Sequence, residues 1–198
     1  MYYTTTTVNG KPLDEFIAKY QDQAKFLVFC QHCSNYQTLW SCPPLLLDIP
    51  QFLQEFNYIY IIGVKVIYDE ETIKSAHTAE KIKEITFQSL QEVKTKLAAA
   101  LLALEQQIPG SVSLSSGGCR LCQRCERCDD RPCRYPEKMR YSLDAFGFDL
   151  TAITSDLLQI ELKWAKNSLP EYYTLIHALL TNQELDKTIL HEMTRGLF

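Results

Sequence analysis

Cysteine is the residue type in this chain best suited to chemistry, and it occurs eight times in two groups. No secretory signal precedes them, so we expect a cytoplasmic protein in which clustered thiols bind metal and do not form disulfides. The first group is Cys30-x2-Cys33-x8-Cys42, and the second is Cys119-x2-Cys122-x2-Cys125-x2-Cys128-x4-Cys133.

The spacing within the second group favours an iron–sulfur centre. Thiolates two residues apart can surround one compact soft centre while the intervening backbone N–H groups point at sulfur. Cys-x2-Cys-x2-Cys followed by a more distant cysteine is the ferredoxin-type arrangement for a [4Fe–4S] cluster. The fourth spacing departs from it, because Pro136 comes three residues after Cys133 and not directly after a cysteine. Eight cysteines can support one or two clusters. Zinc held by two separated cysteine pairs is the alternative cofactor, and metal-free thiols are a third reading.

The first group contains only three cysteines and therefore needs another ligand for four-coordinate binding. That ligand is a thiol of the second group, a non-protein group or His32, although His32 also reads as an exposed loop residue. A centre with one open position would be a site for chemistry as well as electron transfer. His77, His177 and His191 are isolated in sequence, so we expect ordinary surface or core roles for them.

The second cysteine segment is locally basic in a chain of net charge −4. We expect its arginines to stabilise an anionic cluster, and we assign Arg120, Arg134 and Arg140 to cofactor binding. An anionic substrate or an acidic redox partner is the alternative reading, and a solvated loop is the plainest one.

Length and composition indicate a single cysteine-rich domain over residues 1–198. Apolar residues make up 46% and charged residues 22%, as in ordinary globular proteins. The net negative charge argues against binding to nucleic acid, and no apolar run is long enough to cross a membrane. A redox partner protein is possible, and nothing in the sequence specifies an oligomeric state.

Hydrophobic periodicity predicts an α/β (α+β) fold with a mixed sheet of four to five strands, packed helices and two Cys-rich metal-binding loops. We expect the two loops to converge at one edge of the sheet. The predicted strands are residues 2–8, ending at Asn9-Gly10, then 58–68, 111–115, 158–164 and 171–180. The predicted helices are two within 13–28 that meet near Asp22, then 50–56, one long helix over 70–107, either straight or kinked, a helical stretch over 137–146, and a last helix from a cap at Asn182 through Leu190.

Both cysteine segments carry recognisable surroundings. Residues 30–44 read CQHCSNYQTLWSCPP, and residues 114–148 read LSSGGCRLCQRCERCDDRPCRYPEKMRYSLDAFGF. With the YIYIIG and LPEYYTL segments, they resemble the predicted metal-binding protein family catalogued as domain of unknown function 2284. The resemblance covers nearly the whole chain. It implies metal ligands at Cys30, Cys33, Cys42, Cys119, Cys122, Cys125 and Cys133.

Cys128 departs from the family pattern, but we keep it as the eighth candidate metal ligand. The family supplies no reaction. The leading functional hypothesis is a [4Fe–4S] protein that transfers electrons or delivers metal or a cluster. The alternatives are an enzyme or activase with an open-ligand cluster and a zinc-stabilised interaction module.

Overall fold

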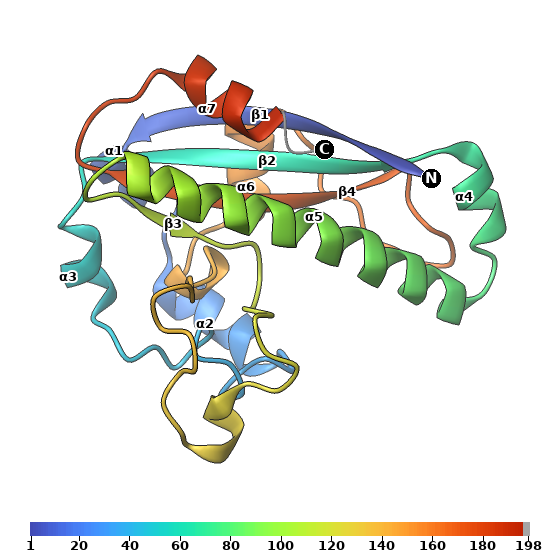
Figure 1. The fold of residues 1–198 in the computed structure, drawn as a ribbon, viewed down its shortest axis with the longest axis horizontal. Helices are drawn as coiled ribbons and strands as arrows, with labels where there is room; N and C mark the ends of the chain where they lie inside the picture. Colours follow the sequence, from blue (N-terminus) through green and yellow to red (C-terminus); the bar gives the residue numbers. More distant parts are fainter. Residues whose placement is uncertain (196–198) are drawn as a thin grey trace.

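A four-stranded antiparallel sheet forms the centre of the computed structural model, which describes residues 1–195 apart from the side chains of 189 and 193–195 (Figure 1). The order of the strands is β1-β2-β4-β3. Their bounds are Tyr2–Pro12 for β1, Tyr58–Tyr68 for β2, Val112–Leu114 for β3 and Tyr172–Thr181 for β4. The predicted α+β class with four to five strands is therefore confirmed, but the strand pairs of this sheet are antiparallel, whereas a mixed sheet was predicted.

Strand β2 lies inside the sheet, which explains its nearly continuous apolar sequence. Its odd-numbered residues Ile59 and Ile61 belong to one apolar cluster, while Tyr60, Ile62 and Val64 belong to another on the opposite face. Strand β1 continues to Pro12, four residues beyond the predicted end. Asn9-Gly10 is therefore not a turn, and Gly10 leaves room for the ring of Tyr60, which a β-carbon would approach to 2.4 Å.

Helix α5 (Ala79–Gln107) covers the face of the sheet that carries Tyr60 and Ile62. The prediction of one helix over 70–107 is wrong, because α4 (Glu70–Ser75) ends before α5 begins. Asp69 caps α4 and Thr78 caps α5, each accepting a hydrogen bond from a backbone N–H three residues later. Helix α7 (Lys187–Arg195) lies near β1 and α5 and begins later than the predicted cap at Asn182.

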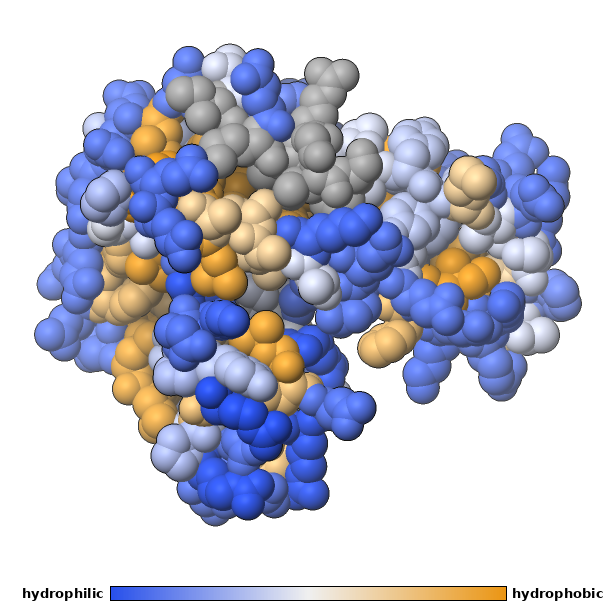
Figure 2. Space-filling model, viewed as in Figure 1, coloured by the Kyte–Doolittle hydropathy of each residue, from blue (hydrophilic) through white to orange (hydrophobic). Residues whose placement is uncertain are grey.

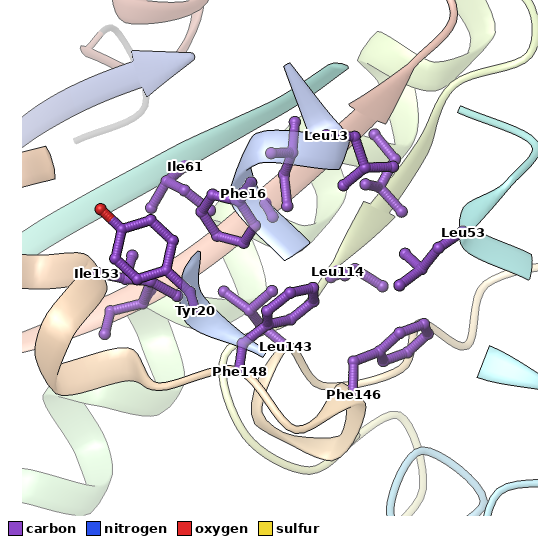
Figure 3. Close-up of a cluster of buried hydrophobic side chains, with 14 of the residues drawn as sticks. Leu13, Phe16, Tyr20, Leu53, Ile61, Leu114, Leu143, Phe146, Phe148 and Ile153 are labelled. Carbon is purple, nitrogen blue, oxygen red and sulfur yellow. The ribbon is translucent and has the colours of Figure 1, made fainter. Parts of the chain in front are cut away.

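Short elements cover the opposite face of the sheet. They are α1 (Leu13–Tyr20), α3 (Ile49–Leu53), α6 (Leu150–Ile153), a 3₁₀ turn η2 (Asp144–Phe146) and a π turn η3 (Thr154–Leu158). Helix α2 (Gln23–Gln31) buries no residue and lies against η2. The predicted junction near Asp22 is confirmed, because its side chain accepts from Lys25 N and caps α2. Figure 3 shows the rings of Phe16, Phe146 and Phe148 gathered with Leu13 and Leu143 in this core. Leu114 and Leu143, which flank the second cysteine segment in sequence, both belong to this core.

Two predicted elements are absent. Residues 137–146 form no α-helix, and only η2 at their end is helical. The guanidinium of Arg140 donates to the carbonyls of Glu137 and Met139, which therefore have partners without helical bonds. Residues 159–164 form no strand, because Leu158 and Ile160 pack onto the face of the sheet beside Gly63 and do not extend its edge.

The cysteine segments lie below the sheet, beside α2 (Figure 1). In the space-filling view this lower lobe is mostly hydrophilic, and the surface is hollowed between it and the end that carries α4 (Figure 2). Among the described helices, none is long and apolar enough to cross a lipid bilayer.

Candidate metal centre

The first cysteine segment begins at the end of α2. Cys30 lies in the last turn of that helix, and its carbonyl accepts from Cys33 N at 2.9 Å. The next turn brings the backbone N–H of Asn35 to 3.5 Å from the Cys33 sulfur. Cys42 follows in a buried position with 7% of its surface exposed. The segment thus places three thiols around one bend of the chain.

The second cysteine segment leaves β3 and runs outward through a short 3₁₀ helix, η1 (Glu126–Asp129). Glu126 is buried and pairs with Arg131 and Arg134, so two positions of the loop are tied to one carboxylate. Arg124 pairs with Asp129 at 2.7 Å on the outer surface. These internal ion pairs hold the loop in shape without regular secondary structure.

Gly118 lets the two cysteine segments touch. A β-carbon there would lie 2.4 Å from Leu39 Cδ1 and 3.4 Å from Cys42 Sγ, so only glycine permits this approach. Next to it, the hydroxyl oxygen of Ser41 accepts from Cys119 N at 2.8 Å. The predicted convergence of the loops is therefore confirmed.

Arg127 joins the segments a second time. Its guanidinium donates to the carbonyls of Leu39, Cys42 and Pro44 at 2.7–2.8 Å. It also lies 4.9 Å from the ring of Trp40, a cation–π distance. Cys128, the next residue, donates to Thr38 O at 3.4 Å and is exposed.

Four thiols of the second group line one pocket. They are Cys119, Cys122, Cys125 and Cys133. Trp40, Leu121, Tyr135 and Met139 form much of its apolar wall, and Arg134 lies at its side. The enclosed space is about 20 Å³, enough for one ion or water molecule. A larger cluster therefore requires the exposed loop to widen.

The three thiols of the first group line a separate pocket of about 170 Å³. Cys30, Cys33 and Cys42 share it with Asp144, whose Oδ1 atom is buried and has no hydrogen-bond partner among the described residues. His32 does not line this pocket, and its Nδ1 atom lies 2.8 Å from Val28 O. Of the three sources considered for a further ligand, His32 is therefore not in the pocket, whereas Asp144, which was not considered, is.

Burial raises the pKa of several thiols. It raises that of Cys30 to about 11, with further contributions from the charges of Asp144 and Cys42. Burial also raises the pKa values of Cys42 and Cys119. These thiols carry protons at neutral pH in the absence of metal, and a bound cation would displace those protons.

The side chains of both pockets are suitable ligands for a soft metal. One pocket has four thiols, and the other has three thiols and the Asp144 Oδ1 atom, which has no hydrogen-bond partner among the described residues. Over residues 1–195, no three Cys, His, Asp or Glu side chains lie close enough together to hold a single metal ion. The thiols of each group therefore line one pocket, but their sulfur atoms are too far apart to bind the same metal ion. In these two pockets of the described chain, no cysteine of one group lines the pocket of the other.

Of the three arginines assigned to a cofactor, only Arg134 lines a thiol pocket, and Arg120 and Arg140 line one neighbouring cavity. Arg134 lines the four-Cys pocket but pairs with Glu126. Arg140 pairs with Glu105, and Arg120 lines a neighbouring cavity that also reaches Cys119.

Sequence reasoning missed Asp144 and Lys94 near the thiols, and it gave His177 only an ordinary surface or core role. Lys94 donates to Gly118 O at 2.5 Å, and burial lowers its pKa to about 8. Its position is readable in the sequence, because it lies four residues after Leu90 and three before Leu97 on the apolar stripe of α5. Asp144 and His177 carry no such local signal.

The model of the family described as "Predicted metal-binding protein (DUF2284)" matches residues 17–180. That span contains all eight cysteines and both pockets. Neither the curated proteins nor the solved structures gave a match. The match covers most of the chain and includes both thiol pockets, and on that ground the chain belongs to this family of predicted metal-binding proteins.

Proposed function

We propose that the protein holds a [4Fe–4S] cluster on Cys119, Cys122, Cys125 and Cys133 and acts in electron transfer or in delivery of metal or a cluster. The supporting observation is that these four thiols line one pocket, while Cys128 donates to Thr38 O outside it. When bound, such a cluster supplies one-electron transfer through soft thiolate ligation.

The surroundings of the four-Cys pocket support an exchange with another protein. Leu121 and Tyr135 line this pocket and remain 45% and 38% exposed. Apolar side chains at the mouth of a metal site allow a partner to approach closely and exclude water. Arg134 and Glu126 also line the pocket and pair with each other, so this pair adds no net charge beside an anionic centre.

The three-Cys pocket supports a second metal position, with Asp144 as its fourth ligand. An unpartnered buried carboxylate oxygen is costly unless a cation or donor meets it. A carboxylate is a harder and more exchangeable ligand than a thiolate. This position therefore favours the second candidate function, an enzyme whose centre exchanges Asp144 for substrate.

Anaerobic purification with iron and sulfide analysis tests the first proposal. We expect brown protein with a charge-transfer absorption that dithionite bleaches, and an electron paramagnetic resonance signal from the reduced state. Cys122→Ser is expected to lose that absorption. The matched control is Cys128→Ser, which changes the same atom in the same loop and is expected to retain it.

Three results would count against this assignment. A colourless protein with stoichiometric zinc supports the interaction module, and thiols with neither metal support a metal-free protein. Equal loss of absorption in Cys122→Ser and Cys128→Ser contradicts the four-residue ligand set. For the second candidate, a Cys30→Ser variant that keeps all its iron and sulfide excludes the three-Cys position as a cluster site.

A further inference from the structure

A cavity of about 570 Å³ lies between α5, the β3–β4 edge of the sheet and the second cysteine segment. Its volume falls within the range of small-molecule sites. Small side chains of α5, Ala98, Ala99 and Ala103, form part of one wall. Cys119 lines it as well, so the cavity adjoins the four-Cys pocket.

His177 faces this cavity from β4. Only 1% of its surface is exposed, and neither ring nitrogen has a hydrogen-bond partner among the described residues. It lies on the α5 side of the sheet, since its neighbours at alternate positions, Leu175 and Leu179, pack in that core. Burial lowers its pKa to about 3, so the ring is neutral and offers one donor and one acceptor.

The charge around the cavity is of one sign. Lys94, Arg120, Lys138 and Arg140 line it, and no aspartate or glutamate of the described chain does so. Arg140 is held by Glu105, and Lys94 already makes one bond, to Gly118 O. Arg120 and Lys138 form no ion pair or side-chain hydrogen bond with any residue that the structure describes.

Part of this positive charge would be explained if the basic side chains neutralise a thiolate at Cys119. That neutralisation does not account for the cavity or for the two unpartnered nitrogens of His177. Burying an imidazole without partners is unfavourable, and a ligand with a polar atom at that depth removes the penalty. Apolar and cationic walls together select a molecule with an apolar body and an anionic group.

We propose that this cavity binds a small organic anion, with its charged group between Lys94 and Arg120, its apolar body against Ala98 and a polar atom on His177. The anionic group is a carboxylate or a phosphate. The site is built from protein groups alone, so the inference stands independently of which metal the thiols bind. It places the ligand beside Cys119.

Isothermal titration of the anaerobically purified protein with benzoate, phenyl phosphate and benzyl alcohol tests the site. We expect one equivalent of at least one anion to bind with a Kd of about 1 mM or tighter. Benzyl alcohol has a similar shape and no charge, and it is expected to bind at least about tenfold more weakly. The preferred anion distinguishes a carboxylate site from a phosphate site.

Two substitutions that each remove one positive charge test where the anion binds. Arg120→Gln is expected to weaken anion binding about tenfold, the effect of one lost charge-assisted hydrogen bond. Arg124→Gln changes the same charge in the same loop, away from the cavity, and is expected to leave the Kd within about twofold. Ala98→Leu fills the cavity and is expected to remove binding while iron content and far-ultraviolet circular dichroism stay unchanged.

The absence of saturable binding by either anion overturns the proposal, whether or not the protein contains a cluster. Equal weakening by Arg120→Gln and Arg124→Gln also overturns it, because that result means attraction by the overall charge of the loop. Binding that survives both Ala98→Leu and His177→Phe places the anion elsewhere and has the same consequence.

Discussion

The hydroxyl oxygen of Ser41 accepts a hydrogen bond from the backbone N–H of Cys119 at 2.8 Å, which joins one thiol segment to the other in the interior. Ser41 is fully buried. Ser41→Ala leaves the Cys119 N–H without this partner, and we expect a loss of about 1–3 kcal/mol in the free energy of unfolding. Denaturant unfolding measures the loss. Ser34→Ala, in an exposed position of the same segment, is expected to change it by less than about 0.5 kcal/mol.

Arg127 contacts three carbonyl groups of the first cysteine segment. A lysine cannot reproduce this planar fork, so Arg127→Lys is expected to increase amide hydrogen exchange over residues 36–44 and lower stability by about 1.5–3 kcal/mol. The control is Arg124→Lys, which alters an exposed ion pair worth less than about 1 kcal/mol. Unchanged exchange in Arg127→Lys would show that the segments hold together without this side chain.

Asp144→Asn tests the fourth position of the three-Cys pocket. The substitution keeps the shape of the side chain and removes its charge, so we expect metal affinity at that pocket to fall at least about tenfold. Competition against a chelator measures the affinity. The four-Cys absorption is expected to persist.

Asp130→Asn serves as the matched control for Asp144→Asn. Asp130 is exposed and has a φ of 51°, a conformation that asparagine tolerates. If both variants lose metal equally, the effect reflects charge in the lobe and not ligation by Asp144.

His177→Phe removes a buried ring whose two nitrogens have no partner in the described part of the chain. We expect the ligand-free variant to be more stable than the parent protein by about 1–3 kcal/mol at pH 7, measured by denaturant unfolding. A loss of stability would mean that the imidazole has a structural partner. That result would also weaken the argument for a ligand at His177.

The same variant is expected to change the response to acid. The pKa of His177 is about 3 in the folded chain against 6.5 for a free histidine. Between these values the unfolded chain binds the additional proton. The free energy of unfolding therefore falls by up to about 1.4 kcal/mol per pH unit as the pH drops below 6.5. His177→Phe lacks this contribution, so the stability difference between the two proteins is expected to widen from pH 7 to pH 5.

The sequence pattern predicted correctly those elements that depend mainly on residues close to one another in the chain. The apolar run of β2 and the junction of two helices near Asp22 were both predicted from a few residues of sequence. The prediction of a helix over 137–146 was wrong because the Arg140 side chain donates hydrogen bonds to two nearby carbonyls. Hydrophobic periodicity gives no information on such a side-chain contact. The prediction of a strand after Leu158 was wrong because that segment packs over Gly63. This packing depends on the tertiary arrangement.

The candidate site divides in the same way. Cysteine spacing identified both thiol groups but placed Cys128 among the candidate ligands; only the family resemblance set it apart from the others, and it does not line the four-Cys pocket. It did not reveal that the groups line different pockets, because that division depends on how Ser41 and Gly118 pack between them. Asp144 was missed for a related reason: it lies more than a hundred residues after Cys42 and meets it only through folding.

The peptide at Gly118 touches every compartment described above. It borders Cys42 Sγ, its carbonyl accepts from Lys94, and the next residue, Cys119, lines both the four-Cys pocket and the anion cavity. If both the proposed metal and the proposed anion bind, we expect a shift of this single peptide to alter all three compartments together, so that occupancy of one changes the affinity of the others. Thermodynamic linkage makes that influence mutual: whatever an anion does to metal retention, the metal does in equal measure to anion binding.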